Sequence, residues 1–280
     1  NGGTIRFAYK NADSQTYSFP IHVNEGTYSK FYAPSHGVFK SNVTGSGTLE
    51  MIIPYLRFNI SGTLPEFKGR IVANGVPYTG TQTIFYHASQ WNSPNVTFTL
   101  KGRAYMTAWT TNAVNVIGGL SGSVGTYLIG SGKQTKGFTC SWEVGGANTD
   151  ETFNGIINDL PAGLNRAYSG TVSIKKVGTG LWRLGGNNTY SGTTQIAGGA
   201  LIVNGKKSGA GMVTVLNGGT LKARASKTSG DGWVANGDFM NARVLEGGAT
   251  FDTAGFNCWF WPVLKHGGAA EKDGGIVKKG

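Results

Sequence analysis

GTGLWRLGGNNTYSGTTQIAGGALIVNG, residues 178–205, is the stretch that decides the fold, because its pattern returns at residues 218–223. Aligning the short strands gives two columns of residues at steps of 19 and 20 positions: Trp182, Leu201 and Leu221; Leu184, Val203 and Ala223. A constant period near 20 residues, with Gly-Gly pairs between the strands, is typical of stacked repeats. Each turn of such a stack carries short strands joined by Gly- and Asn-rich corners, where positive φ angles cost little.

The sequence therefore predicts an all-β fold, a right-handed, single-stranded parallel β-helix. Stacked turns lie about 4.8 Å apart. A chain of 280 residues at about 20 to 25 residues per turn gives on the order of a dozen turns. We expect residues 1–280 to form one continuous β-helix, with irregular rungs in residues 1–165 and repeat rungs in residues 166–280.

The run VGTGLWRLGGNNTYSGTTQIAGGALIVN, residues 177–204, resembles the autotransporter-associated β-strand repeat. Upstream, residues 120–157 resemble the rung that precedes such repeats in secreted Bacteroidota proteins that degrade polysaccharides. The chain is also similar to β-helix carbohydrate-binding modules attached to gut xylanases. That resemblance implies xylan or a related hemicellulose as the ligand. The first 110 residues match these proteins only loosely.

Both ends of the sequence read as the inside of a longer array. The opening NGGTIRF reads as a strand, and the closing IVKKG matches IKKVG at residues 174–178. We therefore expect a fragment of a longer protein, and the resemblance implies an appended catalytic domain in the same chain.

Composition favours a secreted or cell-surface protein. Charged residues are few, the formal net charge is +11, and 46 glycines accompany polar surface residues. An acidic polysaccharide suits this charge better than nucleic acid, for which no recognition motif is present. No apolar run reaches the roughly 18 residues that a membrane span needs. We expect a monomer that contacts neither nucleic acid nor a membrane. Cys140 and Cys258 are expected to be buried thiols rather than a disulfide.

Alternation within GTGLWRL assigns Trp182 to the core, with a sugar platform as the alternative. The opposite face of the same repeat strands then carries a basic column, which either binds a ligand or is a solvated surface. Its members are Arg183, Ile202, Lys222 and Arg224.

Other aromatic residues fall outside the repeat register and are the candidate ligand contacts. An exposed ring beside polar side chains can stack on a pyranose face; the alternative is that such rings cap the core under loops. Alternation places Tyr105, Thr107 and Trp109 on one face. In the WFWP run either Trp259 and Trp261 are outside and Phe260 inside, or the reverse. The predicted ligand-binding residues are Tyr86, Trp91, Tyr105, Trp109, Trp233, Trp261, Arg183 and Arg224.

Catalysis is not expected. β-Helix lyases need carboxylates that hold calcium and a base, and hydrolases need paired carboxylates about 5 to 10 Å apart. Of the 14 acidic residues, six form three close groupings, each in a corner-like segment: Asp150 with Glu151, Asp231 with Asp238, and Glu271 with Asp273. His22, His36, His87 and His266 are dispersed. No catalytic residue, metal ligand or cofactor is predicted, although a structural calcium ion at a corner remains open.

The sequence thus predicts a non-catalytic carbohydrate-binding module that recognises plant cell-wall polysaccharide, xylan above all, and targets an appended glycoside hydrolase. One alternative is a pectate-lyase-like enzyme, which requires clustered carboxylates. A second alternative is a structural stalk or adhesin passenger, which fits the repeat half equally well.

Overall fold

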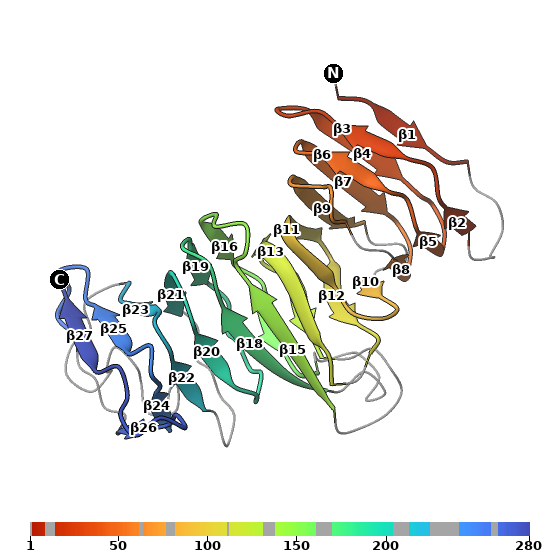
Figure 1. The fold of residues 1–280 in the computed structure, drawn as a ribbon. Helices are drawn as coiled ribbons and strands as arrows, with labels where there is room; N and C mark the ends of the chain where they lie inside the picture. Colours follow the sequence, from red (N-terminus) through yellow and green to blue (C-terminus); the bar gives the residue numbers. More distant parts are fainter. Residues whose placement is uncertain are drawn as a thin grey trace.

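A computed structural model describes residues 2–8, 15–61, 64–76, 82–110, 112–130, 138–160, 170–203, 213–224, 241–258 and 263–280. Within these ranges the regular structure consists of β-strands, and all their pairings are parallel. The rungs follow one another from the N-terminal end to the C-terminal end of an elongated stack (Figure 1). The predicted all-β parallel β-helix is confirmed for the described residues.

One sheet follows the whole stack and contains most of the strands. Its first members come from the N-terminal half: β1 (Thr4–Arg6), β4 (Tyr28–Tyr32), β7 (Thr48–Ile53), β9 (Arg70–Gly75), β11 (Asn92–Gly102) and β13 (Val114–Gly122). Later rungs contribute β15 (Thr139–Val144), β16 (Glu151–Phe153), β18 (Thr171–Lys176), β19 (Leu181–Leu184), β20 (Thr194–Ile196), β21 (Ala200–Val203), β22 (Thr214–Leu216), β23 (Thr220–Lys222), β24 (Ala242–Val244), β25 (Ala249–Asp252), β26 (Leu264–His266) and β27 (Ile276–Lys279). From β15 onward each rung gives this sheet two short strands.

A second sheet covers another side of the N-terminal half. Its strands are β2 (Gln15–Tyr17), β5 (Gly37–Phe39), β8 (Arg57–Ile60), β10 (Thr83–His87), β12 (Ala104–Ala108), β14 (Tyr127–Ile129) and β17 (Ile156–Asn158). A small third sheet pairs β3 (Ile21–Val23) with β6 (Val43–Gly45).

The repeat register agrees with the sequence alignment. Trp182 pairs with Leu201 and Leu201 with Leu221, while Leu184 pairs with Val203. The next rungs depart from the 20-residue period, since Leu221 pairs with Phe251, which is 30 residues later. The core columns nevertheless continue through the described strands of these rungs.

The core is a continuous column of apolar side chains inside the coil. Trp182 is 1% exposed, and its Nε1–H donates to the carbonyl of Leu120 over 2.9 Å. The prediction that Trp182 lies in the core is confirmed. In the N-terminal half, aromatic rings dominate the core, with Phe31 in edge contact with Tyr17 and Phe39. The repeat rungs are filled mainly by Leu, Ile and Val, with Trp182 and Tyr190 among their buried aromatic residues.

Asparagine side chains join the corners of successive rungs. Asn148 adopts a φ of 60°, and its Oδ1 accepts from the backbone N–H of Thr179 at 2.9 Å. Asn217 accepts from the N–H of Gly247 at the same distance. Because a corner leaves backbone donors without strand partners, these amides provide the acceptors that strand pairing does not. This accounts for the Asn-rich corners that the sequence shows.

A buried ammonium group takes a position in a core column. Lys176 pairs with Ile196 and Val144, and the whole residue is 1% exposed. Its Nζ donates to the carbonyls of Val177 and Gly178, the latter at 3.3 Å. Burial lowers the pKa of this lysine to about 8, against a smaller opposing effect of Asp150. The ammonium is thus held by backbone carbonyls at a rung corner.

This lysine makes stability depend on pH in a defined direction. Its pKa is about 8 in the folded chain and has the ordinary value of 10.5 when unfolded. The unfolded state therefore binds more protons between these values, and the free energy of unfolding should rise with pH, by about 2 kcal/mol from pH 8 to 10. Urea denaturation at a series of pH values should show this rise in the native chain and its absence in Lys176→Met. An equal rise in both proteins would assign the effect to other groups.

Both cysteines are free thiols, so no disulfide links them. Cys140 is buried, and burial raises its pKa to about 12. Cys258 is only half-buried, so the prediction of burial is confirmed for the first thiol alone.

Candidate binding groove

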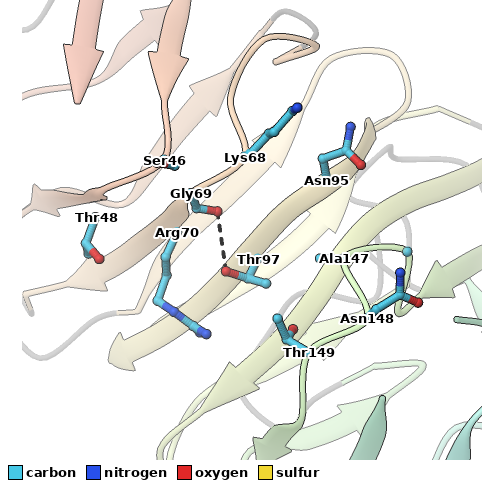
Figure 2. A pocket seen from close by; sticks show the side chains of 11 residues that line it. Ser46, Thr48, Lys68, Gly69, Arg70, Asn95, Thr97, Ala147, Asn148 and Thr149 are labelled. Atoms are coloured by element: carbon cyan, nitrogen blue, oxygen red, sulfur yellow. Dashed lines mark hydrogen bonds between the residues drawn. The ribbon is translucent and has the colours of Figure 1, made fainter. Parts of the chain in front are cut away.

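An open groove of about 450 Å³ crosses the rungs in the N-terminal half (Figure 2). Four segments line it: Ser46 and Thr48, residues 68–70, Asn95 with Thr97, and residues 146–149. We call this feature the groove. Its volume lies within the range typical of small-ligand sites.

The floor of the groove is a row of outward-facing side chains on three adjacent strands. Thr48 of β7 pairs with Arg70 of β9, and Arg70 pairs with Thr97 of β11. One wall includes Lys68, just before β9, and Asn95, inside β11 where its register shifts. The turn between β15 and β16 forms the opposite wall. The groove therefore exists because parallel register brings three turns of the coil to the same level.

Arg70 is held by a polar network that includes Glu151, Thr99 and Ser121. Its Nη2 lies 2.6 Å from Oε1 of Glu151, and its Nη1 lies 3.1 Å from Oε2. Nη1 also donates to the hydroxyls of Thr99 and Ser121. The side chain of Glu151 is 5% exposed and that of Arg70 is 34% exposed. This bidentate pair fixes the direction of the guanidinium at the edge of the groove.

A missing side chain on β13 makes room for this pair. Gly119 pairs with Thr97, so a side chain there would stand next in the floor row. A Cβ at Gly119 would lie 3.0 Å from Cγ of Glu151 and 3.2 Å from Oγ1 of Thr149. The carboxylate of Glu151 on β16 thus lies above a glycine of β13 and reaches Arg70 on β9, with β13 and β11 between them.

The side chain of Lys68 gives the groove a positive charge. None of its lining residues is acidic, and its two cationic residues are Lys68 and Arg70. Glu151 balances Arg70, whereas Lys68 is exposed and has no ion-pair partner among the described residues. Asn148 is also exposed, and its Oδ1 is engaged by Thr179. The Nδ2 of Asn148 forms no hydrogen bond with the described residues and is available as a donor.

The predicted ligand contact Trp91 is instead a core residue, and its assignment to the surface is wrong. It is 1% exposed, and its Nε1–H donates to the carbonyl of Thr107 over 2.8 Å. Its ring packs edge-on against Phe98 at a centroid distance of 5.2 Å. The polar residues around it in sequence misled the prediction, because they occupy the turn while the indole turns inward.

Three other predicted aromatics lie on the second sheet or directly after its strand β12, and they belong to two separate ring pairs. Trp109 stacks on Tyr86 at a centroid distance of 3.7 Å and an interplanar angle of 15°. Tyr86 is 6% exposed, so it serves mainly as the support for Trp109, which is half-buried. Tyr105 is half-buried as well and lies 4.4 Å from the ring of Tyr127. Burial raises the pKa of Tyr105 to about 12, so its hydroxyl stays neutral at physiological pH.

Arg57 adds a cation to this cluster. Its guanidinium carbon lies 5.6 Å from the ring centroid of Trp109. The Nε1 of Trp109 is buried and has no hydrogen-bond partner among the described residues. We call Arg57, Tyr86, Tyr105, Trp109 and Tyr127 the aromatic cluster; Arg57 and Tyr127 were missed by the sequence analysis, and only the parallel pairing of β8, β10, β12 and β14 reveals them.

The predicted basic column is only partly present. Arg183 and Arg224 are exposed, as expected. Ile202 is 1% exposed, and Lys222 is paired with Asp252 over 2.7 Å. That hydrogen bond lowers the pKa of Asp252. Only the two arginines of the column are therefore exposed and unpaired among the described residues. Ile202 is buried and the charge of Lys222 is balanced, so the column is not a continuous cationic surface.

Trp233 and Trp261 lie outside the described residues, as do Trp259, Phe260, Asp231 and Asp238.

Within the ranges that the structure describes, no group of three or more His, Cys, Asp or Glu side chains could hold a metal ion. The same part of the chain has no helix long and apolar enough to cross a membrane. Glu151, from the first acidic pair, is committed to Arg70, and Asp150 accepts from the N–H of Leu181.

Two comparisons with known proteins bear on the repeat region and the whole chain. Residues 174–203 match the family described as the passenger-associated-transport-repeat. The adhesin BmaC autotransporter of Brucella suis biovar 1 (strain 1330) is 36% identical over 85 residues, which cover 30% of this chain and 2% of that protein. The match thus spans a small fraction of the relative's length. The chain carries autotransporter-type β-strand repeats, as the sequence resemblance predicts.

Proposed function

We propose that this chain is a segment of a secreted or cell-surface passenger, in which a β-solenoid rod presents an adhesive surface and performs no catalysis. One observation carries the proposal: the passenger-type repeat at residues 174–203 is stacked in register with the rungs before and after it. The similarity to an autotransporter adhesin supports it. This corresponds to the second alternative from the sequence, the stalk or adhesin passenger.

The geometry suits such a role for a physical reason. Each rung of a solenoid contacts only its neighbours, so the rod can extend without a larger core. Its outer side chains do not build the core and are therefore available for contact with other molecules. A purified chain, immobilised on a sensor, should bind at least one of a panel of extracellular polysaccharides and matrix proteins. Binding to none of them, with the fold confirmed by circular dichroism, would leave a passive spacer and contradict the adhesive role.

A second candidate is the binding of plant polysaccharide, xylan above all, as part of a protein with an appended catalytic domain. The aromatic cluster favours it, because Trp109 and Tyr105 are half-buried rings on one outer sheet. The Bacteroidota and xylanase connection, the monomeric state and the structural calcium ion stay predictions.

If this candidate is correct, Trp109→Ala should weaken retention of the chain in xylan-containing gels by about 2- to 10-fold, because an aromatic contact contributes about 0.5–1.5 kcal/mol. Affinity electrophoresis measures this directly. Tyr32→Ala is the matched control, since Tyr32 is a half-buried ring on the other large sheet, stacked with Arg6. Equal retention of the Trp109 variant and the native chain would remove the cluster from the binding site.

A further inference from the structure

We propose that the groove binds a carboxylate-bearing sugar of an acidic polysaccharide, with Lys68 as the counter-charge and Arg70 as a fixed second donor. This inference rests on the adhesive function proposed above and names its ligand class and its site.

The first argument is the balance of charge. Two cations and no acid line the groove, and Glu151, the acid paired with Arg70, is 5% exposed on its side chain. The ammonium of Lys68 is left unbalanced. A carboxylate entering the groove would therefore meet a cation without displacing an existing partner, and an exposed lysine can rotate to reach it.

The second argument is the set of unused donors. On Arg70, Nη2 bonds only to Glu151, and no hydrogen bond of Nε–H is formed with the described residues. Asn148 offers its Nδ2, because its Oδ1 is engaged by Thr179. Figure 2 shows the Asn95 side chain beside Lys68 on one wall and Asn148 on the other. Amide groups and hydroxyls placed in this way match the ring hydroxyls of a sugar.

The third argument is spacing. Thr48, Arg70 and Thr97 stand in register on three successive rungs, and rungs repeat about every 4.8 Å. A polysaccharide lying along the axis of the coil would thus present consecutive sugars to consecutive rungs. The net charge of +11 would in addition attract a polyanion over a distance set by the ionic strength.

The test compares three polysaccharides by isothermal titration of the intact chain. Polygalacturonate and hyaluronan carry carboxylates from plant and animal sources, and fully methyl-esterified pectin keeps the galacturonan backbone without the charge. We expect binding to at least one carboxylated polymer and, where galacturonan binds, loss of binding on esterification. Lys68→Ala should weaken that binding about fivefold to tenfold. Lys40→Ala should not, because Lys40 is an exposed lysine that does not line the groove.

Equal weakening by the Lys68 and Lys40 substitutions would overturn the proposal, since it would reveal attraction by net charge alone. Binding that survives methyl-esterification would overturn it as well. Failure to bind any carboxylated polymer, while the chain still binds a protein or neutral glycan on the sensor panel, would sink this inference and leave the adhesive function standing. Failure on every surface would sink both.

Discussion

Replacing Trp182 with alanine should lower the free energy of unfolding by about 3–5 kcal/mol, which is the range for removing a fully buried tryptophan. The indole is 1% exposed and stacks on Leu201 of the next rung. The substitution also removes the donor to the carbonyl of Leu120, a bond that reaches across the intervening rung of Glu151. The loss therefore combines a cavity with an unpaired buried carbonyl.

Urea denaturation followed by circular dichroism measures this effect. Arg183→Ala is the matched control, because Arg183 is the next residue on the same strand and is exposed. Its substitution should change the free energy of unfolding by no more than about 0.5 kcal/mol. If the two variants unfolded at the same urea concentration, Trp182 would not be in the core and the register of the repeat rungs would be wrong.

Replacing Glu151 with alanine should destabilise the chain by about 2–3 kcal/mol. Breaking a fully buried ion pair costs about 3–5 kcal/mol, and the 34% exposure of the Arg70 side chain reduces that figure. The two residues are 81 positions apart, and the pair joins rungs across the width of the groove. The guanidinium would also lose the direction in which it faces the groove.

A second acidic residue provides the comparison. Glu143 pairs with Lys175 over 2.8 Å, with side chains 26% and 41% exposed. Its alanine variant should lose no more than about 1 kcal/mol, as exposed ion pairs do. The double variant Arg70→Ala/Glu151→Ala should be less destabilised than the sum of the single variants. Additive losses would mean that the two side chains contribute independently and that the network does not exist in solution.

The repeat half was predictable because its information is periodic. Trp182, Leu201 and Leu221 recur at nearly constant spacing, and each occupies the same place in a rung, so alignment alone gave their register. The periodic pattern could not predict that a charged residue, Lys176, occupies a core position. The backbone carbonyls of a neighbouring corner, which bind its ammonium group, explain that position.

The groove could not be found in the same way. Arg70 and Glu151 are far apart in sequence and follow no period, because the rungs between them have turns of different lengths. Trp91 and Trp109 have similar polar surroundings in the sequence, yet the first is in the core and the second stacks on Tyr86. Whether an aromatic ring faces the core or the surface depends on how its strand pairs with other strands. The residues next to the ring in the sequence do not determine that pairing.

Adherence of cells that display this chain as a surface passenger tests the central claim most directly. Cells of a non-adherent strain displaying the native chain should attach to a surface coated with the polymer it binds. Cells displaying equal amounts of Trp182→Ala should attach less, because the outer side chains lose their common register. Attachment of native-chain cells no greater than that of cells with an empty anchor would contradict the proposed adhesive role.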